Sequence, residues 1–70
     1  MTGEIEVVIN GETRAVPAQL DVGALLLHLG LPVGRVAIER NLEIVPRARW
    51  GSTIVQSGDN FEIVHLVGGG

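Results

Sequence analysis

The fold of this chain is decided near its start, where residues 4–16 read EIEVVINGETRAV. Apolar side chains at positions 5, 7 and 9 alternate with their neighbours in the period of a half-buried strand. Asn10-Gly11 follows at once, and this dipeptide is the commonest solution for a type I′ turn, in which both central residues have positive φ. Residues 12–16 then return as a partner strand, which Pro17 ends. The stretch therefore predicts a β-hairpin.

A single short helix is predicted after the hairpin, over residues 22–29. Asp21 is a suitable N-cap, because its carboxylate can accept hydrogen bonds from amides of the first turn. From Val22 onward, apolar residues recur at i, i+3, i+4 and i+7, which places them on one helix face. Gly30 occupies the position where helices commonly end in a left-handed residue, and Pro32 prevents continuation. The helix therefore has one apolar face to bury.

The second half of the chain predicts short strands joined by turns. Val36 to Glu39 and Glu43 to Val45 are expected to be strands, with a turn at Asn41-Leu42 between them. The remaining expected elements are one helical turn at Arg47 to Trp50, an extended piece at Thr53 to Val55, a turn at Ser57 to Asn60 and a last strand at Phe61 to Val67.

The order of these elements predicts an α+β fold with two layers, because one amphipathic helix needs one apolar sheet face to cover it. The first and last strands are both apolar enough to be expected at the centre, and a parallel pair there accommodates the long crossover through the helix. This is the β-grasp, or ubiquitin-like, arrangement, a mixed sheet of about four or five strands with one main helix. We expect residues 1–67 to form it and residues 68–70 to be a flexible tail. The predicted core contains Val7, Leu25, Leu26, Leu29, Ile38, Phe61 and Ile63.

Composition excludes several classes of function. The chain has 70 residues, no cysteine and a formal net charge of −3. The absence of cysteine removes disulfides, thiolate nucleophiles and zinc–thiolate sites. The mild acidity argues against nucleic-acid binding, no run approaches the ~20 apolar residues of a membrane span, and residues 1–4 lack the features of a signal peptide. We therefore expect a cytoplasmic protein that binds neither nucleic acid nor membrane.

The polar residues give little sign of catalysis. His28 and His65 are the only histidines, and no further metal ligands accompany them at matching spacing. Asp59 follows Gly58 and is interpreted as a turn residue rather than a general base. We therefore expect no catalytic residue, no metal and no bound cofactor.

Trp50 has two interpretations. The favoured one is a lid on the edge of a small core. The other is a contact with a partner, since Trp is enriched in binding hot spots, and Arg47 and Arg49 beside it offer guanidinium groups to carboxylates. Four of the five arginines lie between positions 35 and 49. We interpret them as a solvated face rather than a basic patch.

The last strand is followed by Gly68-Gly69-Gly70. As structure this run is unfavourable, because glycine packs nothing and loses the most entropy on ordering. As a reactive arm, however, the glycine run suits a role in another protein's active site. A chain without Cβ atoms can enter a narrow channel, and it presents a sterically bare carboxylate. Such a carboxylate can attack the α-phosphate of ATP when a second enzyme supplies the nucleotide site, and the acyl-adenylate then accepts a nucleophile. A frayed end is the alternative interpretation.

These features resemble the ThiS family of sulfur carrier proteins of thiamine biosynthesis. The resemblance lies in VAIERN at residues 36–41, EIVPR at 43–47 with Trp50, Gly58-Asp59 and VGGG at 67–70. It implies that a ThiF-type adenylyltransferase activates the carboxylate of Gly70 with ATP, with Gly68 and Gly69 as the tail. A sulfur donor such as a cysteine desulfurase relay then converts this carboxylate to a thiocarboxylate. A ThiG-type thiazole synthase takes the sulfur.

Two other functions remain open at this point. A sulfur carrier for molybdopterin or another thiolation pathway has the same fold and terminus, and a non-catalytic ubiquitin-like interaction module has the same fold. In each case a partner must dock. Val64 and Leu66 are the candidate docking residues, because strand alternation places them opposite to Phe61 and Ile63. A two-layer domain has nothing of its own to cover that face, and exposed apolar patches often mark binding sites.

Overall fold

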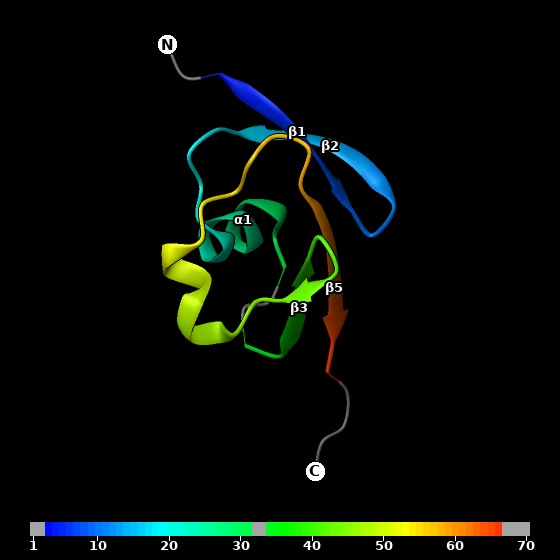
Figure 1. Cartoon of the computed structure of the whole chain (residues 1–70), viewed down its shortest axis with the longest axis vertical. Coiled ribbons are helices and arrows are strands. Elements are labelled where there is room, and N and C mark those ends of the chain that lie inside the picture. The colour runs from blue at the N-terminus through cyan, green and yellow to red at the C-terminus, as the bar shows by residue number, and fades with distance from the viewer. Residues whose placement is uncertain (1–2, 32–33, 67–70) are drawn as a thin grey trace.

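The computed structural model describes residues 3–31 and 34–66 of the chain. The elements in chain order are β1 (Glu4–Ile9), β2 (Glu12–Pro17), α1 (Val22–Leu29), β3 (Val36–Arg40), β4 (Glu43–Ile44), the 3₁₀ helix η1 (Arg47–Ser52) and β5 (Asn60–His65). Figure 1 shows α1 and the yellow-green turn of η1 on one side of the strands. The molecule therefore has the predicted two layers.

The five strands form one mixed sheet in the order β2-β1-β5-β3-β4. β1 pairs in parallel with β5, with Val8 opposite Asn60 and Ile9 opposite Phe61. The other pairings, of β1 with β2, β3 with β5 and β3 with β4, are antiparallel. The first and last strands are thus central and parallel neighbours, and the predicted β-grasp arrangement is confirmed.

The local turn and cap signals act as the sequence predicts. Asn10 and Gly11 have φ of 49° and 85°, as a type I′ turn requires. The side chain of Asp21 accepts a hydrogen bond from the amide of Ala24 at 2.7 Å. Gly30 ends α1 in the left-handed region, with φ of 74°. These residues fix both ends of the helix and the turn that starts the sheet.

The later elements differ from the prediction at their ends. β4 covers only Glu43–Ile44, and the predicted helical turn is a 3₁₀ helix that continues through Ser52. The predicted extended piece is present as an isolated bridge between Ile54 and Asp21. β5 ends at His65. The predicted last residue of that strand, Val67, and the predicted tail at 68–70 lie outside the described residues.

The core lies between α1, η1 and one face of the sheet. Every predicted core residue is buried except Leu29, which is partly buried and packs against the cluster. The core also contains six residues beyond those seven: Ile9, Val16, Val22, Val36, Trp50 and Val55. Trp50 of η1 and Val55 after it extend the core beyond the facing residues of α1 and the sheet.

Candidate functional site

The candidate site is built on β5, because this strand leads toward the glycine run. Phe61 and Ile63 are buried, whereas Val64 and Leu66 are 56% and 55% exposed. The two residues proposed for docking therefore lie on the surface, as strand alternation predicts. Their role in docking stays a prediction.

The side chain of Asn10 holds the second half of β5. Its Nδ2 donates to the carbonyl of Ile63 at 3.1 Å, and its Oδ1 accepts from the amide of Ile63 at 2.8 Å. β1 ends at Ile9, so this amide group continues the pairing with β5 beyond the end of β1. The sequence signal at Asn10 indicated only a turn, because a preference for positive φ says nothing of what the side chain binds.

β5 is also held on its other side. Its register with β3 runs from Phe61 opposite Arg40 to His65 opposite Val36. Beyond the strand, the amide of Leu66 donates to the carbonyl of Arg35 at 2.8 Å. The chain is therefore fixed by hydrogen bonds as far as Leu66, the last described residue.

One buried carboxylate holds the start of β5. Asp59 is 5% exposed, and it accepts hydrogen bonds from Arg40 Nε at 2.8 Å, Asn41 Nδ2 at 3.1 Å and the amide of Gln56 at 2.8 Å. Burial alone raises the pKa of Asp59, but these hydrogen bonds and the charge of Arg40 outweigh it, so the pKa lies below the ordinary 3.8. Asp59 is thus an ionised structural residue, although its bonds reach β3 rather than staying within one turn.

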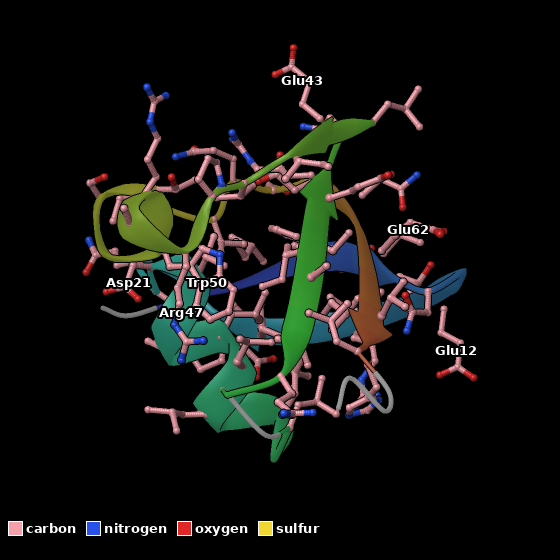
Figure 2. All side chains as sticks on the ribbon, turned by 90° about the horizontal axis from the view of Figure 1, so that it is seen from below. Glu12, Asp21, Glu43, Arg47, Trp50 and Glu62 are labelled. Atoms are coloured by element: carbon pink, nitrogen blue, oxygen red, sulfur yellow. The ribbon has the colours of Figure 1, made fainter. Side chains whose placement is uncertain are left out.

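The interpretation of the arginines as a solvated face is wrong for Arg40, whose side chain is 30% exposed and paired with Asp59. Arg47 also bonds within the fold. Its Nη1 donates to the carbonyl of Gly34 at 2.9 Å, and its guanidinium lies 5.2 Å from the centre of the Trp50 ring (Figure 2). Both side chains therefore join separate segments of the chain.

Trp50 belongs to the core. It is 6% exposed, and its indole Nε1 donates to the carbonyl of Val45 at 3.0 Å. A buried indole needs such a partner for its N–H. The favoured interpretation of Trp50 as part of the core is confirmed.

Within residues 3–31 and 34–66, no group of three or more His, Cys, Asp or Glu side chains is placed to hold a metal ion. Across the same described ranges, no helix is long and apolar enough to cross a membrane. His28 and His65 are both exposed.

Known proteins are similar to this chain in both sequence and fold. The ThiS family model matches residues 7–70. The sulfur carrier protein ThiS of Escherichia coli is 30% identical over 66 residues, which cover 94% of this chain and 100% of that protein. The crystal structure of the thiamine biosynthesis protein ThiS from Geobacter metallireducens matches with a TM-score of 0.82 at 30% identity, over 94% of this chain and 100% of that one.

A longer relative contains a similar segment. A thiazole synthase of Paramagnetospirillum magneticum is 48% identical over 66 residues, which are 94% of this chain but 20% of that protein. This chain thus spans one fifth of the length of that relative. The family match and the matches to the two ThiS proteins cover the β-grasp domain almost completely. The chain belongs to the ThiS family.

Proposed function

We propose that this chain is a sulfur carrier protein of thiamine biosynthesis and that the carboxylate of Gly70 carries the sulfur. The observation that carries the proposal is the family match, which extends through Gly70. The bracing of β5 by Asn10 and Arg35 supports it, because a firmly held strand is a suitable base for a reactive arm. In this proposal the chain is a substrate of partner enzymes and not itself a catalyst.

The first proposed step is adenylation. An oxygen of the Gly70 carboxylate attacks the α-phosphorus of ATP in a ThiF-type adenylyltransferase, and pyrophosphate leaves. The product is an acyl-adenylate, whose carbonyl carbon is open to nucleophiles because AMP is a good leaving group. Gly68 and Gly69 favour this step, since no side chain obstructs entry of the arm into a narrow active site.

The second proposed step introduces sulfur. A persulfide sulfur from a donor such as a cysteine desulfurase relay attacks the acyl carbon, and AMP leaves. A thiol then reduces the acyl disulfide, which frees the Gly70 thiocarboxylate and oxidises the thiol side to a disulfide. A ThiG-type thiazole synthase accepts the sulfur. The similar segment within a thiazole synthase chain supports this partner.

The proposed docking contact for the adenylyltransferase includes Val64 and Leu66. Both are aliphatic and more than half exposed, and Leu66 is only four positions before Gly70 in the sequence. An enzyme that binds these two side chains is therefore close to the glycine tail at residues 68–70. Leu66→Glu should leave the fold intact and weaken the complex, because an interface buries the new charge without a partner.

Intact mass spectrometry tests the proposed function. The chain is incubated with a cognate adenylyltransferase, ATP and a sulfur source, and we expect the mass increase of one oxygen replaced by sulfur. Deleting Gly70, amidating its carboxylate or adding one residue after it should abolish this increase without changing the circular dichroism spectrum. Sulfur acquired by any blocked form would contradict the proposal, and an interaction module would keep its binding with the added residue.

A further inference from the structure

The turn that joins β1 to β2 contains a chemically reactive asparagine. Asn10 is followed by Gly11, whose amide nitrogen has no side chain beside it. Such a nitrogen can attack Cγ of the preceding asparagine, which is the first step of deamidation. Both residues are exposed, so water reaches this turn. The turn therefore combines what deamidation needs, namely an asparagine side chain, an unhindered backbone amide and water.

In the folded chain the side chain of Asn10 is held on β5. Its Nδ2 donates to the carbonyl of Ile63 at 3.1 Å, and its Oδ1 accepts from the amide of Ile63 at 2.8 Å. At neutral pH an amide supplies a donor and an acceptor side by side, whereas a carboxylate supplies acceptors alone. Cγ must turn toward the Gly11 nitrogen before a ring can close, and that rotation breaks both bonds. Opening of this contact must therefore precede the reaction.

The β3–β4 turn offers an internal comparison. Asn41 has a φ of 52°, close to the 49° of Asn10. Its side chain is also bonded at both ends, since Nδ2 donates to Asp59 at 3.1 Å and Oδ1 accepts from the amide of Asn60 at 2.9 Å. The next residue is Leu42, whose branched side chain hinders attack by its own amide nitrogen. The two asparagines thus differ mainly in the residue that follows.

We propose that Asn10 is a deamidation site, that its two bonds to Ile63 delay the reaction, and that the product loosens the second half of β5. The amide nitrogen of Gly11 loses its proton to water or hydroxide and attacks Cγ of Asn10. The bond from Cγ to Nδ2 breaks, Nδ2 takes up a proton, and ammonia leaves. Water then opens the succinimide at either carbonyl, which gives aspartate or isoaspartate at position 10. This inference goes beyond the proposed function and concerns the chain alone.

Each product disturbs the contact with Ile63. A new aspartate is ionised at neutral pH, because its reference pKa is ~3.9. One carboxylate oxygen then lies against the Ile63 carbonyl, which loses its donor. Isoaspartate adds a carbon to the backbone of the turn and displaces the side chain, so both bonds are lost. The backbone pairing of β1 with β5 ends at Ile9 and Phe61 and does not replace them. The second half of β5 is then held by β3 alone.

Ageing the purified chain tests the site and its delay. One sample is kept folded at neutral pH, and a second is kept in urea, where the contact with Ile63 is absent. Peptide mapping by mass spectrometry follows the replacement of each side-chain amide by a carboxyl group. Asn10 should convert in both samples, about tenfold more slowly or slower still in the folded one. Asn41 and Asn60 should stay largely intact over the same period.

Two results of the ageing experiment contradict the inference. Equal rates at Asn10 in the folded chain and in urea overturn the delay by Ile63. Equal conversion of Asn10 and Asn41 in urea overturns the assignment of the site, because the residue that follows would then make no difference.

The effect of the product is tested on the aged isoaspartate form, separated by ion exchange, and on Asn10→Asp. In the isoaspartate form the Ile63 amide should exchange its hydrogen about tenfold faster or more. Asn10→Asp should lower the thermal midpoint by about 4 °C or more. The control is Gln19→Glu, which makes the same amide-to-carboxylate change at another exposed residue of positive φ, here 71°.

The control should change the thermal midpoint little. If Asn10→Asp does not fold, the hydrogen exchange of the aged wild-type chain still gives the answer. Exchange of the Ile63 amide at the wild-type rate in the isoaspartate form overturns the loosening of β5. Equal midpoint losses in Asn10→Asp and Gln19→Glu overturn it as well, because the added charge alone would then account for the loss.

Discussion

The carboxylate of Asp59 joins the loop before β5 to the end of β3 and the turn that follows it, 19 and 18 positions earlier in the sequence. It accepts from β3 through Arg40, from the following turn through Asn41, and from its own loop through Gln56. Asn41 in turn accepts a hydrogen bond from the amide of Asn60 at 2.9 Å. The start of β5 is thus fixed to the β3–β4 hairpin by side chains as well as by the sheet.

Replacing Asp59 with Asn should destabilise the protein by about 1–3 kcal/mol at neutral pH, because Arg40 loses its charged partner. The folded-state pKa of Asp59 lies below its ordinary value. Its contribution is therefore complete above the unfolded pKa of ~3.9 and is lost as the pH falls through the folded pKa.

Urea unfolding of wild type and Asp59→Asn at neutral and acidic pH checks this prediction. The difference in free energy of unfolding should be constant near neutrality and shrink below about pH 4. A difference that grows on acidification would contradict the assigned direction of the pKa shift.

Single residues were predicted from sequence where their role is local. Asp21 and Gly30 act within one helical turn, so their residue type and position suffice. The bonds of Asn10 and Arg40 were not predicted, because they reach residues 53 and 19 positions away. Such contacts follow from the register between strands, which alternation within one strand does not determine.

At the scale of elements, the length of each helix or strand determined whether it could be predicted from the sequence. β1, β2 and α1 are long enough to show their periods, and their predicted bounds match within one residue. β4 has two residues, which is too short for any period. The 3₁₀ helix η1 is positioned by the burial of Trp50 and by its bond to Val45. Tertiary packing, rather than local propensity, therefore defines the middle of the chain.

Two neighbouring leucines of α1 test how the helix is held on the sheet. Leu26 is 0% exposed and Leu27 is 70% exposed. Leu26→Ala should lower the free energy of unfolding by about 2–5 kcal/mol, because it removes buried methyl groups and leaves a cavity. That is close to the ~5 kcal/mol at the low end of domain stability.

Leu27→Ala is the matched control for this helix. It removes the same atoms from a mostly exposed position, so its midpoint of chemical unfolding should change little. Equal losses in the two variants would mean that the buried face of α1 has been assigned wrongly.

For the whole molecule, the central position of the first and last strands has a direct consequence for stability. β1 pairs with β2 on one side and with β5 on the other, and β5 also pairs with β3. The β1–β2 hairpin is therefore attached to the rest of the sheet only through β1 and β5. The core, however, contains residues of the hairpin and of the rest of the fold, since Val7 and Val16 of the hairpin pack with residues of α1 and β5.

We expect this shared core to make unfolding a single cooperative transition. Trp50 is the only Trp, and its fluorescence reports on the packing of η1 at the side away from the hairpin. Far-UV circular dichroism and the exchange of the Val7 and Val16 amides report on the sheet and on the hairpin. All three signals should give one midpoint in urea, as is usual for small domains. Loss of amide protection in the hairpin at a lower urea concentration than the loss of Trp50 fluorescence would show that the pairing of β1 with β5 does not couple the two halves of the fold.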